Sequence, residues 1–495
     1  MKINYQSRSW SWPSSASQRS RVLSLSLGCR VLALSSVQLC SVSANAQAFD
    51  FAGISKLPPH TIEAPVAHGV TALATKASRS RPSRTRGVGP SEKELRAIFY
   101  QAVQAAFERS PQVQRAQADY KASLADIDEA KGQRMPQVDL GTQAKSARFG
   151  PGADYDAGGG GGVSLNVTTP VYDWGRIRNT IKSRKYLSRA ANSSVEAELE
   201  NSAYEVSSNM VELGKQRVIV EISKQFVQRM DELVRMLAGI VSVDKGRLSE
   251  LTQAKARLLQ AKAALNSAES QVRDTELNLR KRVGDRPLML PQSPKWNIHF
   301  ADLDTLLSKV DDNPSIHLSK AQAHSAELDA QVVRSSSLPQ LNWVVRKTTA
   351  QDGLGREQPW ETTLSLTWAA FRGGSTRASE RAALQRAESS RQRTEEQRLD
   401  LEYRIRTADH DARTLLGRAE LYRDLTLESE RIRLAFFEQW YHLGKRSLLD
   451  VLIAENDHYN NQVGEVSQRF DGYKAILRQY AGAGSLTGWL AGSQW

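Results

Sequence analysis

The chain has 495 residues, of which 67 are lysine or arginine and 54 are aspartate or glutamate, and its formal net charge is +13. Its first 90 residues hold 11 basic and 2 acidic side chains, so the remaining body carries only +4. The pI of about 9.6 therefore gives no argument for binding nucleic acid. Both cysteines, Cys29 and Cys40, lie in this first part, which excludes a disulfide or thiolate metal site in the body.

Residues 1–46 have the three parts of a secretory signal peptide. Scattered arginines come first, 31–42 is an apolar run, and Ala44-Asn45-Ala46 is a cleavage site of the A-x-A type. The apolar run is too short to span a membrane. We expect cleavage after Ala46. Lipidation at Cys40 is not expected, because a lipobox requires a small residue where this chain has Leu39.

Residues 47–90 read as a linker that is rich in proline, serine and arginine. Two interpretations are open. The arginines could bind an acidic surface, or the segment could be a solvated, disordered basic arm, and its composition favours the arm.

The next long stretch, 175–246, contains no proline and few glycines. At about 1.5 Å per residue, a helix of this length would extend roughly 107 Å. After Gly246 a strict heptad follows, with Leu251, Leu258, Leu265, Val272 and Leu279 at one position and Ala254, Ala261 and Ala268 at the other. This pattern predicts a second helix that folds back at Gly246 and packs on the first by knobs into holes.

The landmarks of this stretch occur twice along the chain, which indicates an internal duplication. The matched pairs are Pro136 with Pro339, Gly175 with Gly373, and Gly246 with Gly444. We expect a first repeat at 91–284, a connector at 285–312, a second repeat at 313–486 and a tail at 487–495.

After Pro136 and again after Pro339, apolar residues alternate with polar ones. Each repeat is predicted to hold one β-hairpin, at about 137–168 and 341–368, with one apolar face. The hairpins either pack on a soluble core or face lipid, since about ten alternating residues match an outer-membrane barrel strand. Such barrels begin at about eight strands, so the second interpretation requires the chain to oligomerise.

The order of these landmarks resembles that of the outer-membrane efflux protein family, the TolC-like exit channels. The resemblance covers about 91–486 and rests on three short motifs in each repeat. They are the proline before the first strand (Pro136; Pro339), the aromatic and glycine-rich corner after the second strand (170–176; 368–374), and Gly-x-x-Ser at the helix elbow (Gly246 to Ser249; Gly444 to Ser447).

The resemblance implies a mainly α fold with a β membrane portion. Duplicated long coiled-coil helical hairpins would form an α-barrel, and each protomer of a homotrimer would add four strands to one 12-stranded outer-membrane β-barrel. It also implies location in the bacterial outer membrane, with a tunnel that extends into the periplasm. The implied partners are outer-membrane lipid, a periplasmic adaptor (membrane fusion) protein and an inner-membrane ABC or proton-driven pump.

The resemblance also assigns roles to particular residues. The barrel-to-helix corners are Trp174 with Gly175 and Gly373 with Gly374, and the helix elbows contain Gly246, Ser249, Gly444 and Ser447. The pore entrance, or gate, is placed at the second elbow and consists of Tyr441, Arg446 and Asp450.

Threefold symmetry would make Asp450 a ring of three carboxylates, which favours cations and repels itself when the opening narrows. The alternative is that Asp450 is an ordinary residue of a first helical turn, where a carboxylate is stabilised. The chain departs from the family at two positions. It has Ile453 at a second acidic position and Thr252 where an acidic partner is common, so the contacts that close the gate are expected to be weaker or to involve other residues.

The sequence shows no catalytic constellation, metal-ligand spacing or phosphate loop, so neither an enzyme nor a cofactor is expected. The function expected is a passive outer-membrane duct for type I protein secretion or multidrug efflux. The missing lipobox and the long uninterrupted repeats favour type I secretion. The alternative is a soluble periplasmic coiled-coil adaptor or scaffold, which the alternating strands disfavour.

Overall fold

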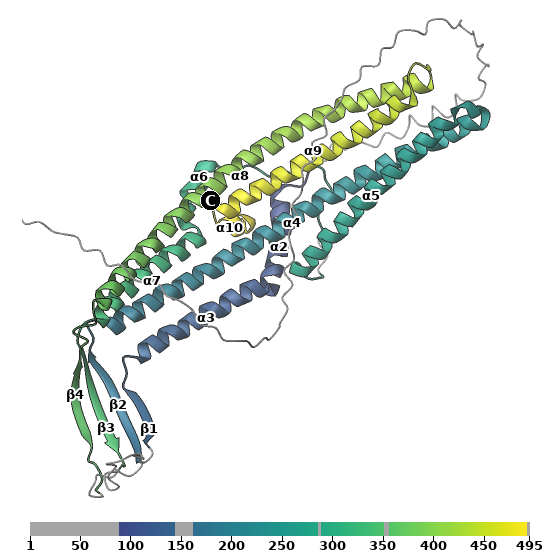
Figure 1. The fold of residues 1–495 in the computed structure, drawn as a ribbon. Helices are drawn as coiled ribbons and strands as arrows, with labels where there is room; N and C mark the ends of the chain where they lie inside the picture. The colour runs from purple at the N-terminus through teal and green to yellow at the C-terminus, as the bar shows by residue number, and fades with distance from the viewer. Residues whose placement is uncertain (1–88, 144–161, 286–288, 351–355, 493–495) are drawn as a thin grey trace, which may run out of the picture. The chain divides into compact units, whose positions relative to one another are not determined.

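The computed structural model describes residues 89–143, 162–285, 289–350 and 356–492 (Figure 1). The expected signal peptide at 1–46 lies outside these residues, as does the linker at 47–90 apart from its last two positions. Within the described part, no helix is long and apolar enough to cross a membrane.

The first repeat runs from two short helices through a hairpin to two long helices. Its elements are α2 (Glu92–Arg109), α3 (Pro111–Gly132), β1 (Gln137–Gln143), β2 (Gly162–Tyr172), α4 (Arg176–Val243), the 3-10 turn η1 (Lys245–Arg247) and α5 (Leu248–Val283). α4 has 68 residues and α5 has 36, and the two helices pack against each other. The alanine and leucine positions of the heptad are the buried face of α5, because these small and large side chains interlock with α4.

The second repeat follows the same order. The connector ends in two short elements, α6 (Leu303–Ser308) and η2 (Val310–Asp312). The repeat itself has α7 (Pro314–Ser336), β3 (Gln340–Thr348), β4 (Glu361–Thr367), α8 (Ser375–Tyr441) and α9 (Leu448–Gly482), and a short α10 (Leu486–Leu490) follows α9. α8 has 67 residues and α9 has 35, close to the lengths of α4 and α5. The mainly helical fold with a β portion that the sequence predicts is confirmed.

The two hairpins join into one antiparallel sheet of order β1-β2-β3-β4, in which β2 pairs with β3 (Figure 1). Residues that pair directly across an antiparallel sheet point to the same face. One face is mainly apolar and carries Val138, Leu140, Val163, Leu165, Val167, Leu341, Trp343, Val345, Leu364 and Leu366. Thr142, Thr362 and, near the end of β3, Lys347 lie on the same face. Leu140 is 75% exposed and Leu366 is 66% exposed, while Leu165, Val167 and Val345 on the inner strands are half-buried.

The largest core cluster joins the two repeats through the connector. Trp296 is 2% exposed and its ring contacts Phe470 and Tyr473 of α9. The Tyr473 hydroxyl donates to the backbone oxygen of Trp296 at 2.8 Å and accepts from its backbone nitrogen at 3.0 Å. Gly214 of α4 makes this packing possible, because a Cβ there would lie 2.6 Å from the Trp296 ring. The connector is therefore part of the core.

A second apolar cluster lies where α4 and α5 meet the beginning of α9 and the end of α8. Its buried members include Phe226 and Leu237 of α4, Leu251 of α5, Trp440 of α8 and Leu452 of α9. Because the members of this cluster come from both helical hairpins, the two hairpins pack against each other near their elbows.

Candidate functional site

The corners between sheet and long helices are built from two consecutive residues with left-handed backbone. In the first corner these are Trp174 (φ 54) and Gly175 (φ 79), and in the second they are Gly373 (φ 59) and Gly374 (φ 85). Each second residue is the N-cap of the long helix that follows. Gly175 is therefore the structural equivalent of Gly374, one position later than the match with Gly373 that the sequence suggests.

Trp174 occupies a backbone conformation that glycine adopts far more readily. Its indole nitrogen donates to the backbone oxygen of Pro339 at 2.8 Å, and its own backbone oxygen accepts from the Ser335 hydroxyl at 3.2 Å. Asp173 accepts from the backbone nitrogens of Gly175 and Ile177 at 3.0 and 2.7 Å. These contacts hold the first corner against the second repeat, which offsets the strain at Trp174.

The second elbow turns through Gly444, whose φ of 58° permits the reversal. Ser447 is the N-cap of α9, and its hydroxyl accepts from the backbone nitrogen of Asp450 at 3.2 Å. The Asp450 carboxylate in turn accepts from the backbone nitrogen of Ser447 at 3.2 Å and from its hydroxyl at 3.0 Å. This reciprocal arrangement is a capping box, so Asp450 has a local role in starting α9.

The first elbow is built differently. The Asp244 carboxylate accepts from the backbone nitrogen of Gly246 at 2.9 Å and begins the 3-10 turn η1. α5 then starts at Leu248, so Ser249 is its second residue and not its cap. Only the second Gly-x-x-Ser pattern therefore places its serine at a helix N-cap, which is the position where a hydroxyl stabilises free backbone N–H groups.

Tyr441 and Arg446 both contact residues of α8. The Tyr441 ring stacks on Phe437 at a centroid distance of 5.9 Å. Arg446 donates from Nε to Gln439 Oε1 at 3.2 Å, and its guanidinium lies 4.3 Å from the centre of the Phe436 ring. Across the described residues, no hydrogen bond or ion pair links Tyr441, Arg446 and Asp450 to one another. The three candidate gate residues thus share an elbow but do not form one contact network within a protomer.

A buried charged cluster close to the elbows was missed by the sequence analysis. Glu455 of α9 is 5% exposed. It accepts from Arg229 Nε of α4 and from Arg433 Nη1 of α8, both at 2.9 Å. Glu455 falls seven residues after the buried Leu448, so a charge on the buried stripe of α9 was the signal that could have revealed it.

His458 lies one turn further along α9 and is 4% exposed. Its Nδ1 is 3.1 Å from the Ser429 hydroxyl of α8. Burial lowers the pKa of His458, and the nearby Arg229 and Arg433 lower it further. The neutral imidazole is therefore the favoured form in the folded protein.

Further along the same interface, Glu212 of α4 accepts from Lys474 of α9 at 2.9 Å, and Lys215 of α4 donates to Asp471 of α9 at 3.0 Å. Burial alone would raise the pKa of Glu212. Its hydrogen bonds with Gln216 and the two lysines outweigh this effect and lower the pKa to about 2. Charged pairs thus link α4 to α9 at two levels.

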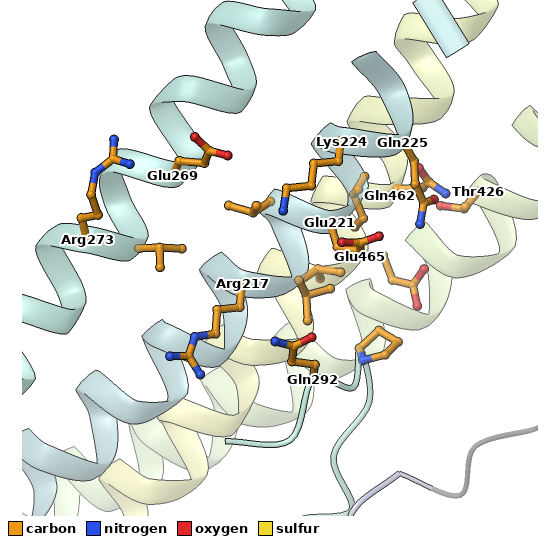
Figure 2. A pocket seen from close by; sticks show the side chains of 16 residues that line it. Arg217, Glu221, Lys224, Gln225, Glu269, Arg273, Gln292, Thr426, Gln462 and Glu465 are labelled. Atoms are coloured by element: carbon orange, nitrogen blue, oxygen red, sulfur yellow. The ribbon is translucent and has the colours of Figure 1, made fainter. Parts of the chain in front are cut away.

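A groove of about 680 Å³ lies where α4, α5, α8 and α9 meet the connector (Figure 2). α4 supplies Arg217, Glu221, Lys224 and Gln225, and α5 supplies Glu269 and Arg273. Its charges are of both signs. Burial raises the pKa of Glu465 on α9, although Arg469 acts in the opposite direction. No group of acidic, histidine or cysteine side chains in the described chain could hold a metal ion.

The sheet has one exposed apolar face and is continued by two long helical hairpins, the architecture expected of an outer-membrane channel protomer. A sequence profile described as outer membrane efflux protein matches residues 102–285 and 309–471. The chain belongs to this family, whose members are passive outer-membrane channels. No curated protein matches the chain.

The fold is similar to that of several solved channels. The outer-membrane channel OprN is 19% identical, with 86% of this chain and 98% of that chain covered at a TM-score of 0.69. The CmeC channel of Campylobacter jejuni is 17% identical, with 79% of this chain and 86% of that chain covered at a TM-score of 0.68. The outer-membrane protein VceC of Vibrio cholerae is 18% identical, with 78% of this chain and 96% of that chain covered at a TM-score of 0.65.

Proposed function

We propose that the protein is the outer-membrane exit duct of a tripartite export system. A periplasmic adaptor and an inner-membrane ABC or proton-driven pump supply the connection and the energy, and the duct itself is passive. The observation that carries this proposal is the four-stranded sheet with an exposed apolar face and two edge strands, β1 and β4.

Such a sheet is incomplete in lipid. Each unsatisfied backbone N–H or C=O group in the hydrocarbon costs several kcal/mol, so a membrane sheet must close on itself. β1 and β4 each have seven residues and run in opposite directions, so β4 of one copy can pair antiparallel with β1 of the next. At least two copies are needed to reach the smallest barrels, of about eight strands. The family resemblance supplies the number three, and hence a homotrimer with 12 strands.

The cargo belongs to one of two classes, secreted protein or small toxic molecules. The absence of a lipobox at Cys40 supports type I protein secretion. A direct discrimination comes from cross-linking the protein in its native cells and identifying the attached pump. An ATP-driven exporter would assign protein secretion, and a proton-driven pump would assign drug efflux.

The gate in this proposal is the second elbow. Asp450 is half-exposed at the first turn of α9, and Tyr441 and Arg446 are exposed beside it. In a threefold assembly the Asp450 carboxylates would face one another and favour cations at the entrance. The capping box does not compete with this role, because it holds the carboxylate in place and leaves its charge intact.

The proposal is tested with full-length protein extracted from the outer membrane. We expect a trimer by native mass spectrometry and discrete ion-conducting steps after reconstitution in planar bilayers. A water-soluble periplasmic protein that never conducts would overturn the proposal and favour the adaptor or scaffold function. Intact mass of the same sample also tests whether the mature chain begins after Ala46 without attached lipid.

A further inference from the structure

One row of polar residues crosses all four strands of the sheet. Asp139 of β1 pairs with Asn166 of β2, Asn166 pairs with Arg346 of β3, and Arg346 pairs with Glu361 of β4. Because direct cross-strand partners share a face, the four side chains form a continuous line on one side of the sheet. We call this line the charged row.

The charged row lies on the face opposite the apolar one. On the two inner strands of the sheet, this face carries Ser164, Asn166 and Thr168 of β2 and Asn342, Val344 and Arg346 of β3. Pro170 and Thr348 share this face through their pairing with Asn342 and Ser164, so Val344 and Pro170 are its apolar residues on β2 and β3. A polar face of this kind turns to the lumen when an outer-membrane barrel closes, because the apolar face turns to lipid.

We propose that the charged row is a lumen belt that sets the ion preference of the pore within the barrel, separately from the gate at the helix elbows. This inference rests on the proposed channel function. Each copy adds two carboxylates and one guanidinium, so the belt has an excess of negative charge and favours inorganic cations and cationic cargo.

The placement of the charges strengthens this preference. Asp139 and Glu361 lie on the two edge strands, while Arg346 lies on an inner strand. Closure of β4 against β1 of the next copy therefore places a carboxylate on each side of every subunit seam. Asp139, Arg346 and Glu361 are all exposed in the protomer. In a barrel closed with its apolar face toward lipid, these charges would face the water of the lumen.

Asn166 connects the acidic and basic parts of the row. Its amide nitrogen donates to the Thr168 hydroxyl at 3.3 Å, whereas its side-chain oxygen has no hydrogen-bond partner among the described residues. Arg346 is its direct neighbour on β3 and carries only donors. The row thus places an unused acceptor next to the strand position of Arg346, and no hydrogen bond joins the two side chains among the described residues.

The decisive experiment compares two neighbouring cations on β3. Arg346→Gln removes a charge from the belt, and Lys347→Gln removes the same charge from the opposite face, where Lys347 contacts Gln358 and Glu357. Reversal potentials are measured in a KCl gradient at about 0.1 M or below, where the Debye length is about 10 Å or more. We expect Arg346→Gln to raise the cation-to-anion permeability ratio by roughly twofold or more, and Lys347→Gln to leave it unchanged.

The carboxylates should act in the opposite direction. Asp139→Asn and Glu361→Gln should each lower the ratio, and Glu357→Gln, outside the four strands, should not. Equal effects at 346 and 347, or unchanged ratios in all three belt variants of a conducting channel, would overturn the belt and leave the channel function standing. A wild-type protein that does not conduct would overturn the proposed function and this inference with it.

Discussion

Arg229 of α4 donates a hydrogen bond to Glu455 of α9 across 226 positions of sequence, at 2.9 Å. Arg433 of α8 completes the contact from the other side of the carboxylate. Three helices and both repeats therefore meet at one buried acid. A charge in this position is tolerated only because two cations and their hydrogen bonds compensate its loss of water.

Replacing the acid should loosen the joint between the hairpins. Glu455→Gln keeps the shape of the side chain but leaves two arginines without their counter-charge. We expect destabilisation of about 3–5 kcal/mol, as for breaking a buried ion pair. Thermal unfolding in detergent, followed by circular dichroism, would measure it.

The matched control is Glu428→Gln, which removes an exposed ion pair with Arg431 and should cost about 1 kcal/mol or less. Similar losses in the two variants would show that Glu455 is no more than a surface charge.

Stability should decline in mild acid because of His458. Its folded-state pKa lies below the ordinary value of 6.5, so below about pH 6.5 the unfolded chain binds a proton that the folded chain refuses. The free energy of unfolding then falls as the pH falls. The groups that face the imidazole are Arg229, Arg433, Ser429, Glu430 and Glu455.

His458→Gln should flatten this pH dependence relative to wild type, whereas His442→Gln, at an exposed position, should not. Unfolding temperatures measured from pH 7.5 down to 5 would show the difference. Parallel curves for wild type and His458→Gln would contradict the expectation.

Gly214→Ala should destabilise the core by about 1–3 kcal/mol, because an added methyl group overpacks a filled site. The new Cβ would lie 2.6 Å from the Trp296 ring and 3.0 Å from Phe470. Gly239→Ala, in the same helix, meets nothing within 4 Å and should instead stabilise α4 by about 0.5–1 kcal/mol. Opposite signs in the two unfolding curves are the expected result, and loss of stability in both would refute it.

The two faces of β4 should respond differently to arginine. Leu366 is on the apolar face and Ser365 is on the polar face. Arginine on the lipid side of a barrel costs roughly 2–4 kcal/mol at the midplane. Leu366→Arg should therefore reduce the amount of trimer in the outer membrane, and Ser365→Arg should be tolerated. Equal amounts of both variants in isolated membranes would reject the lipid-facing assignment.

Charge and capping can be separated at Asp450. Asp450→Asn removes the charge but retains an oxygen that can accept from the backbone nitrogen of Ser447. It should reduce cation selectivity and weaken block by divalent cations. Ser447→Ala retains the carboxylate and removes the cap, so it should lower stability by about 0.5–2 kcal/mol and leave selectivity unchanged. If Asp450→Asn conducts like wild type, Asp450 serves only to start the helix.

Arg446→Ser tests the other part of the gate. The change removes the contacts of Arg446 with Gln439 and Phe436, which hold the elbow to the end of α8. We expect a higher open probability in single-channel records, together with increased antibiotic leakage in cells. An unaltered open probability would remove Arg446 from the gate.

The long paired helices and the two faces of the sheet were predictable from the sequence. Heptad spacing and strict alternation report local geometry, since helical and strand periods place side chains on fixed faces. For this reason Leu251 and Ala254 were expected in the α4–α5 seam, and Leu364 and Leu366 on one face of β4. The match of Gly175 with Gly373 was off by one position. Trp174 adopts a left-handed backbone conformation that is not expected of a tryptophan, so the sequence did not indicate it as the equivalent of Gly373.

The alternation determined which face each strand residue takes, but the pairing of β2 with β3 decided that Asp139 and Glu361 belong to one row. Likewise, α9 carries Glu455 on a stripe that the heptad marks as buried, yet its partners Arg229 and Arg433 come from two other helices. Periodicity describes how a segment repeats along its own axis. Contacts between distant segments depend on how the helices and strands pack together, and only the tertiary structure contains that information.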